Sequence, residues 1–286
     1  MSVSRREFLA LGGALALMPA TSAVASDLNF IPSLILENFE KSLWLSSNRS
    51  ADRAVYVIAA PWCPFCKQLY HAQSEVDHDI DFRYVFQQFR RFGPAVLNAF
   101  FLEENDQLGI FYNDPFAPTA VSDRSVKFFD EINVVTTNKM ASAIGSLLSG
   151  VGGSGSSGAY VYPTVVYRKD DDGIVALAGA WDELKSIDRF SATPAANAPT
   201  PSRFKEMITA PPVGRGIRRN FFAERDGVLI YSAPTTSAPQ IDVFSEGSGF
   251  EFDLISQVNG EEWLGVRLFS GFDGVAWGRR ADFFTQ

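Results

Sequence analysis

Residues 54–70 read AVYVIAAPWCPFCKQLY, and this stretch decides the fold. Its first part, 54–60, is a continuous apolar run of strand length, which is typical of a strand buried on both faces of a sheet. The chain's two cysteines, Cys63 and Cys66, follow at once. Pro64 suits the first turn of a helix, and the residues after it can continue that helix. The sequence therefore predicts the order strand, cysteine, helix.

A C-x-x-C pair that opens a helix has a specific chemical use. The first sulfur faces the helix N-terminus, where unpaired backbone N–H groups and the helix dipole stabilise a thiolate. Cys63 is the predicted nucleophile, and Cys66, one helical turn further on, is the predicted resolving thiol. Exchange with a client then runs through a mixed disulfide, in a direction set by the reduction potential of the pair. Pro64 and Phe65 lie between the two cysteines and tune that potential.

Three other interpretations of the pair stay open. It can be a structural disulfide, although closing so short a loop contributes little stability. It can be half of a zinc site, but zinc takes about four ligands and the chain has no other cysteine. The only histidines, His71 and His78, lack the spacing of a zinc finger, so we expect no metal and no cofactor. Finally, the spacing can be chance.

The sequence after the cysteines predicts an α/β arrangement. A second strand at 81–85 is joined to the first by the cysteine helix, so the two strands should be parallel in a βαβ unit. Apolar spacing and turn signals place the other elements: a helix at 30–46, a mainly helical stretch at 88–150, strands at 159–167 and 173–177 with a hairpin turn between them, and a helix at 183–189.

The last third of the chain has a different pattern. Residues 191–202, SATPAANAPTPS, have the composition of a linker, which we extend to 191–220. Short strands with turns between them then predict a small all-β barrel at 221–286. Its expected strands are 227–231, 240–244, 250–256, 263–268 and 275–279. The sequence thus predicts two domains, an α/β domain at 27–190 and a β domain.

The N-terminal 25 residues have the features of a secretory signal peptide. They contain Arg5 and Arg6, an apolar run at 8–18 and a small-residue cleavage site at 23–25. The stretch around the two arginines resembles a twin-arginine signal. We therefore expect a periplasmic protein. A net charge of −8 argues against nucleic acid as a partner, because no broad basic face is available.

Two segments resemble the signatures of thioredoxin-fold proteins. Residues 60–67, APWCPFCK, resemble the active-site segment, and Tyr162-Pro163-Thr164 resembles the cis-proline loop. The helical insert between them, at 88–158, is similar to that in the catalytic domain of the periplasmic disulfide isomerases DsbC and DsbG. The resemblance covers residues 50–190.

This resemblance implies a thioredoxin-like fold with a helical insertion and a thiol:disulfide oxidoreductase or isomerase activity on envelope proteins. The implied partners are client proteins with cysteines and a membrane redox partner that resets the pair. Pro163 would follow a cis peptide bond beside Cys63, and Tyr162 would offer backbone groups to an extended client. The alternative for Pro163 is a proline in an edge strand or bulge.

Two departures from the family pattern bear on the activity. Thioredoxin and the oxidase DsbA have a buried acid six residues before the first cysteine, where this chain has Val57. Proton transfer assisted by that acid is therefore absent, which fits the isomerase branch better. The isomerases also have an N-terminal dimerisation domain, and residues 26–52 are too short for one. Oxidase, reductase and isomerase roles stay open.

The C-terminal segment resembles bacterial SH3-type domains at 229–234, Trp263 and 274–278. Such domains commonly bind cell-wall peptides or proteins, which implies a cell-wall or protein ligand for this one. The alternative for Trp263 and Trp277 is that both are core residues. A second function for the whole chain follows from this domain: a non-catalytic envelope binding or assembly factor, in which the thioredoxin fold is a scaffold and the SH3-like domain recognises the partner.

Overall fold

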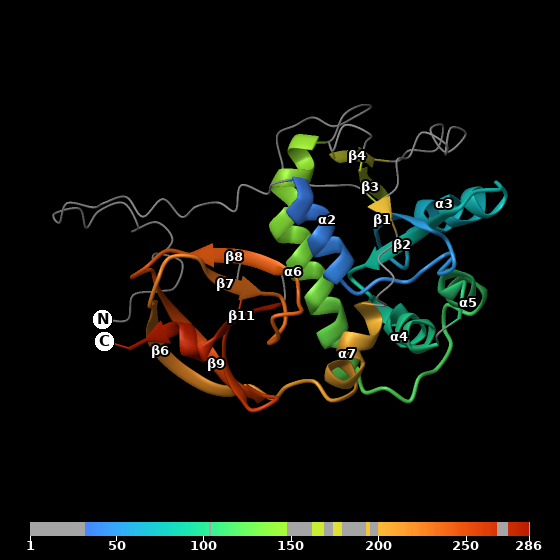
Figure 1. The fold of residues 1–286 in the computed structure, drawn as a ribbon. Coiled ribbons are helices and arrows are strands. Elements are labelled where there is room, and N and C mark those ends of the chain that lie inside the picture. The colour runs from blue at the N-terminus through green and yellow to red at the C-terminus, as the bar shows by residue number, and fades with distance from the viewer. Residues whose placement is uncertain are drawn as a thin grey trace, which may run out of the picture.

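A computed structural model describes residues 32–102, 104–147, 162–168, 174–178, 193–194, 200–267 and 274–285. The predicted signal peptide, the hairpin turn at 169–172 and the helix at 183–189 lie outside the described residues. The described part combines an α/β lobe with a lobe built on a large antiparallel sheet (Figure 1). Within these residues no helix has the length and apolar character needed to cross a membrane.

The sheet of the α/β lobe is built around the apolar run of the opening stretch. β1 (Arg53–Ala59) is buried from its second residue onward. It pairs in parallel with β2 (Ile80–Phe86), and α3 (Pro64–Ser74) connects the two strands, as predicted. The sheet order is β2-β1-β3-β4, with β3 (Thr164–Arg168) antiparallel to β1 and to β4 (Ile174–Ala178), and β5 (Thr193–Pro194) pairs with the start of β1.

The helices around this sheet form where the sequence predicts helices, but their bounds differ from the predicted ones. The described part of 88–150 is mainly helical, as predicted; it contains a 3-10 turn (Arg90–Phe92), α4 (Gly93–Phe101), α5 (Gln107–Asn113) and α6 (Asp123–Leu147). The first helix, α2 (Pro32–Lys41), is shorter than the expected 30–46. It stops because the chain then runs beside β2, where Leu45 exchanges backbone hydrogen bonds of 3.0 and 2.8 Å with Tyr84.

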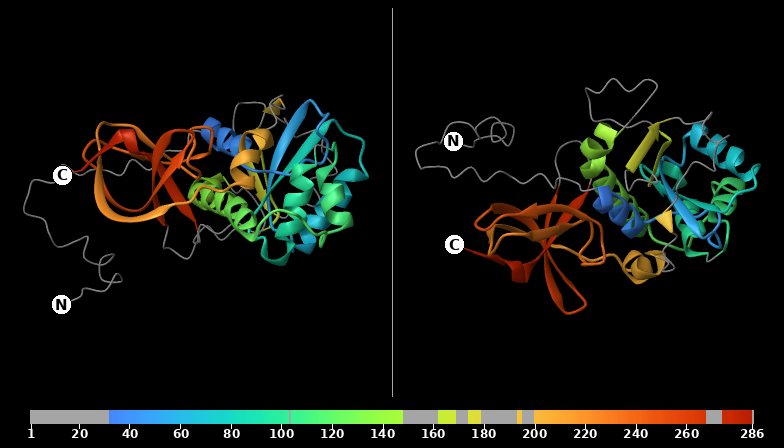
Figure 2. Two further views of the ribbon diagram at one scale, coloured as in Figure 1. Left: turned by 90° about the horizontal axis from the view of Figure 1, so that it is seen from below. Right: turned by 45° about the horizontal axis from the view of Figure 1, so that its top comes forward.

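In the described residues the second sheet has seven antiparallel strands in the order β12-β6-β9-β10-β11-β7-β8. All five strands expected in this region are present: β7 (Val228–Tyr231), β8 (Gln240–Phe244), β9 (Gly249–Val258), β10 (Glu261–Arg267) and β11 (Val275–Arg279). The sheet curves around a buried core that includes Phe252, Leu264 and Phe283 (Figure 2). We call residues 215–267 and 274–285 the β lobe.

The stretch 191–220, expected to be a linker, contains regular structure. α7 (Thr200–Thr209) lies within this stretch, and β6 (Arg215–Ala223) begins in it, so the β lobe starts before residue 221. β6 pairs with β9 along most of its length, and a short last strand, β12 (Phe283–Phe284), pairs with its end. The backbone groups of β6 find their hydrogen-bond partners in β9 and β12, which are distant in the sequence. The composition of 191–220 alone therefore does not predict the strand.

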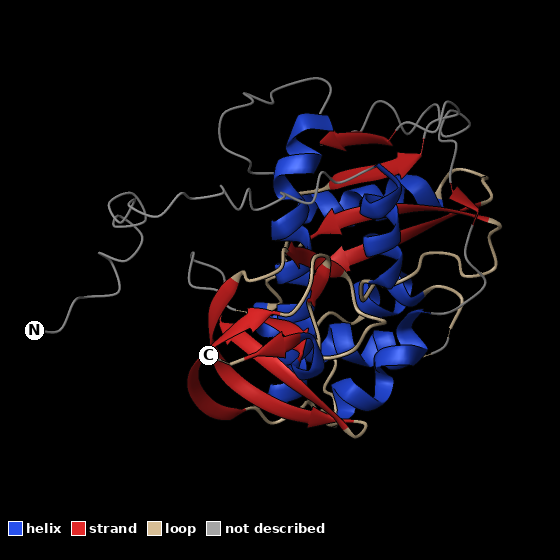
Figure 3. Ribbon diagram, turned by 60° about the vertical axis from the view of Figure 1, so that its left-hand side comes forward, coloured by secondary structure: helices blue, strands red, loops and turns tan. Residues whose placement is uncertain are grey.

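The long helix α6 lies between the two sheets (Figures 1 and 3). It contacts β2 and β4 of the α/β lobe and β8 and β11 of the β lobe. Val135 of α6 belongs to the core of the β lobe, and Lys139 pairs with Asp242 at 3.1 Å. Asn38 of α2 adds two hydrogen bonds of 2.9 Å to the backbone of Gln240. The two lobes are therefore joined through α2 and α6.

Candidate active site

The predicted order of strand, cysteine and helix is confirmed. Cys63 is the N-cap residue of α3, with extended backbone angles, and Pro64 occupies the first turn. The amide of Cys63 donates to the carbonyl of Ala60 at 3.0 Å, and the amide of Lys67 donates to the carbonyl of Cys63 at 3.3 Å. These bonds fix Cys63 at the helix N-terminus, where the backbone N–H groups lack partners within the helix.

The two cysteines are free thiols in different environments. Cys63 is 5% exposed and Cys66 is fully buried at 0%. A hydrogen bond from the Cys66 thiol, aided by the backbone N–H groups of Cys66 and Phe65 and opposed by burial, lowers the pKa of Cys63 from 9.0 to about 6. Burial, together with that shared hydrogen bond, raises the pKa of Cys66. The negative charge of the pair therefore resides on Cys63, which makes it the better nucleophile near neutral pH.

The structure brings the second predicted segment next to the cysteines. The Tyr162–Pro163 peptide bond is cis. The Sγ atom of Cys63 lies 3.8 Å from the carbonyl oxygen of Tyr162 and can donate its thiol hydrogen to it. Pairing of β3 with β1 explains the proximity, because Thr164, which follows the proline, lies opposite Ile58, shortly before the cysteines.

Three further side chains, none of them among the predicted site residues, surround this site. The Trp62 ring packs edge-on against Tyr162, with centroids 5.9 Å apart. The guanidinium of Arg90 lies 4.2 Å from the centre of the Trp62 ring, a cation–π contact. Gln88 donates from Nε2 to the hydroxyl of Tyr162 at 3.2 Å. Trp62 directly precedes Cys63 in the segment 60–67, but no sequence signal linked Gln88 or Arg90 to the cysteines, because their contacts depend on the path of the chain after β2.

That path has an unusual backbone conformation. Gln88 and Arg90 have φ values of 57° and 49°, in the left-handed region that residues other than glycine rarely adopt. α6 holds the segment in place: the half-buried Asp130 accepts from the Phe89 amide at 3.1 Å, and Asn133 donates to the Phe86 carbonyl at 2.7 Å. Burial raises the pKa of Asp130 to about 6, although its backbone hydrogen bonds act against the rise.

Other features of the site bear on its chemistry. Val57, six residues before Cys63, is fully buried in β1. Beneath the pair, the hydroxyl of Tyr84 donates to the carbonyl of Cys66 at 3.4 Å. Within the described residues, no group of three or more His, Cys, Asp or Glu side chains could hold a metal ion. Phe65, between the cysteines, is 53% exposed and lies at the surface beside the pair.

The pKa of Cys63 leads to a prediction about its reactivity. In the reduced protein, alkylation of Cys63 by iodoacetamide should rise with pH and reach half its plateau near pH 6, because only the thiolate reacts. A Cys66→Ala variant loses the hydrogen bond that lowers this pKa most, so its midpoint should move to higher pH. Cys66→Ser keeps a donor at that position and should shift the midpoint less. Equal midpoints in all three proteins would contradict this cause of the shift.

Comparison with known proteins finds matches among solved structures alone. No family model matches the sequence, and no curated protein matches it. Among solved structures, the cell wall binding domain of the staphylococcal phage 2638A endolysin is 18% identical, with a TM-score of 0.22 over 24% of this chain and 73% of that one. Lysostaphin from Staphylococcus simulans is 19% identical, with a TM-score of 0.22 over 43% of this chain and 51% of that one. Structural similarities with TM-scores this low support no conclusion about fold or function.

Proposed function

We propose that this chain is a periplasmic thiol:disulfide interchange protein whose α/β lobe is a thioredoxin-like domain with a helical insertion. The position of Cys63 is the main observation that supports the proposal. It lies at the N-terminus of α3 with a lowered pKa, and its sulfur is 3.8 Å from the backbone oxygen that precedes the cis proline. A stabilised thiolate supports attack on a client disulfide, and the neighbouring backbone of Tyr162 supports pairing with an extended client segment.

The proposed reaction has two steps. The Cys63 thiolate attacks one sulfur of a client disulfide, and the other client sulfur leaves as a thiolate. Cys66 then gives up its proton and attacks the Cys63 sulfur, which releases the client as a dithiol and leaves the Cys63–Cys66 pair oxidised. Two electrons pass from the pair to the client in this direction. The reverse sequence oxidises a client dithiol, and isomerisation combines attack with release by a different client thiol.

The residues around the pair have proposed roles in binding the client. The backbone of Tyr162 would pair with an extended client segment, and Phe65 would contact its side chains because it is largely exposed. Trp62 and Arg90 would hold the Tyr162 ring in position through their ring contacts. Pro64 and Phe65 would tune the reduction potential. The proposed partners are cysteine-containing client proteins and a membrane redox partner that resets the pair.

For the β lobe we propose an SH3-like domain with a cell-wall or protein ligand, on the sequence resemblance given above. Both tryptophans of that resemblance are buried, Trp263 at 1% and Trp277 at 4% exposure. This burial favours a core role for them. A ligand of the SH3-like domain would therefore bind through other residues.

The test of the proposed function is a trapping experiment. In a Cys66→Ser variant the second step is blocked, so Cys63 should remain joined to client proteins as mixed disulfides. These adducts should appear in periplasmic extracts on non-reducing gels and disappear on reduction. A Cys63→Ser variant is the matched control and should form none. If Cys66→Ser yields no adduct with a model client such as scrambled ribonuclease, the exchange function is wrong.

A further inference from the structure

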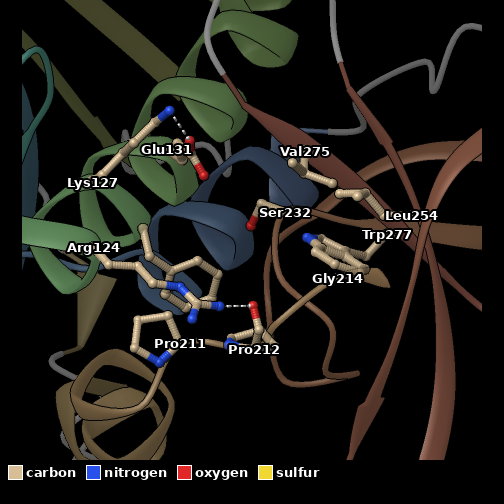
Figure 4. Close-up of a pocket in the computed structure, with 11 residues that line it drawn as sticks. Arg124, Lys127, Glu131, Pro211, Pro212, Gly214, Ser232, Leu254, Val275 and Trp277 are labelled. Atoms are coloured by element: carbon tan, nitrogen blue, oxygen red, sulfur yellow. Dashed lines mark hydrogen bonds and ion pairs between the residues drawn. The ribbon is translucent and has the colours of Figure 1, made fainter. Parts of the chain in front are cut away.

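A small cavity lies between the two lobes, away from the cysteine pair. Its volume is about 190 Å³. One wall is a face of α6, and the opposite wall belongs to the β lobe (Figure 4). The α6 residues are spaced at i, i+3, i+4 and i+7, so they share one helix face: Arg124, Lys127, Phe128 and Glu131. The floor is apolar and is formed by Leu254, Val275 and Trp277.

The strongest evidence that the cavity is a binding site comes from Ser232. This residue is 3% exposed, and within the described part of the chain its hydroxyl has no hydrogen-bond partner. Figure 4 shows the hydroxyl directed toward the cavity. Buried polar groups in proteins almost always have a partner, because an unsatisfied one keeps its full desolvation penalty. A ligand atom in the cavity would supply the partner that Ser232 lacks.

The other polar groups at the cavity are mainly hydrogen-bond donors. The guanidinium of Arg124 is held at the rim by a 2.5 Å bond from Nη2 to the carbonyl of Pro212. A guanidinium has five N–H donors, so others remain for a ligand. The indole nitrogen of Trp277 faces the same space (Figure 4). Glu131, the one carboxylate that the described residues place in the wall, is paired with Lys127 at 3.5 Å. A group that accepts hydrogen bonds and carries negative charge fits this set.

We infer that the cavity binds the carboxylate of a small organic acid or of the C-terminal residue of a peptide. The planar guanidinium of Arg124 matches a carboxylate in shape and charge. A single negative charge suits the site better than a phosphate dianion, because Glu131 adds a negative charge to the wall. The cavity is smaller than ordinary ligand pockets of roughly 300–1,000 Å³, so it would admit one residue or an acid of similar size. The apolar floor would hold a short aliphatic side chain.

The test uses the full mature protein and defined probes. N-acetylalanine represents the small acid, trialanine represents the peptide end, and trialanine amide lacks the carboxylate. Both acids should bind in a calorimetric or NMR titration and raise the melting temperature, whereas the amide should do neither. The acid that binds more tightly identifies the source of the carboxylate. Equal binding of trialanine and its amide, or no saturable binding up to about 10 mM of either acid, would overturn the inference.

Three variants separate ligand binding from a structural role. Arg124→Gln should weaken binding of the acid at least about tenfold, as expected for the loss of a charged hydrogen bond. The matched control is Arg225→Gln, since Arg225 is an exposed arginine paired with Asp282 at 3.1 Å, and it should bind normally. Ser232→Ala removes an unpaired buried hydroxyl, so it should raise the melting temperature of the free protein and lower its affinity for the acid. Unchanged affinity in Ser232→Ala would contradict the proposed contact.

Discussion

A Cys63→Ser variant is expected to lose thiol:disulfide exchange, with a fall in the rate of insulin reduction of at least about 10³-fold. The serine hydroxyl occupies the same position at the N-terminus of α3 but stays protonated at neutral pH, so no thiolate is available to attack. Because Cys63 is the N-cap of α3 and serine is a good N-cap residue, the fold should be unaffected. The assay is the turbidity of insulin reduced by dithiothreitol, with the rate compared at equal protein concentration.

Two controls distinguish the loss of the Cys63 thiolate from a change in the fold as the cause of lost activity. The circular dichroism spectrum and melting temperature of Cys63→Ser should match those of the reduced wild-type protein. Lys67→Gln, an exposed change one turn further along α3, should keep most of the activity. If Cys63→Ser reduces insulin as fast as the wild type, the exchange function is excluded, and the envelope binding factor becomes the better interpretation.

The second large effect is expected for stability, in an Asp81→Asn variant. Asp81 and Arg83 form a buried ion pair at 2.9 Å, with side chains 1% and 5% exposed. Asp81 also accepts hydrogen bonds from the Ser46 hydroxyl at 2.6 Å and from the amides of Ser47 and Asn48 at 3.0 and 3.1 Å. Asparagine would leave the guanidinium of Arg83 buried without an opposite charge. We expect the free energy of unfolding to fall by about 3–5 kcal/mol.

The measurement is urea unfolding of the reduced protein, followed by tryptophan fluorescence. A matched change, Asp282→Asn, breaks the pair with Arg225, whose side chain is 67% exposed, and should cost less than about 1 kcal/mol. A loss for Asp81→Asn as small as that of the control would show that Arg83 finds enough compensation in Tyr56 and Trp44. The Tyr56 hydroxyl lies 3.3 Å from Arg83, and the guanidinium lies 4.3 Å from the centre of the Trp44 ring.

The local sequence was sufficient to predict the structure around the two cysteines. The run 54–60 and the residues after it are adjacent in the chain, and their order alone fixes a buried strand, an N-capping cysteine and a helix. The five strands expected after residue 221 are also present, because each one alternates with clear turn residues. The cis peptide before Pro163 agrees with the family resemblance rather than with any local pattern.

The elements that the sequence did not predict depend on contacts between distant segments. β6 is mostly exposed over Arg215–Asn220, so its sequence lacks the apolar alternation of a strand, and pairing with β9 decides its conformation. In α7 the buried Ile208 anchors a helix within a stretch whose composition indicates a linker. The contact of Arg90 with Trp62 requires the left-handed backbone after β2, which α6 holds from a position 40 residues further along the chain, at Asp130. No short window of sequence contains that information.

The reduction potential of the Cys63–Cys66 pair, measured by equilibration in glutathione buffers, tests the central claim most directly. The pKa of Cys63, about 6, lies between the values near 7 for thioredoxin and 3.5 for DsbA. A stabilised thiolate favours the reduced form, so the potential should fall between about −270 and −120 mV. Such a value, with equilibrium reached through mixed disulfides, is the expected result for an exchange catalyst. A potential below about −300 mV in a disulfide that glutathione cannot reach would mean a structural bond, and it would contradict the proposed function.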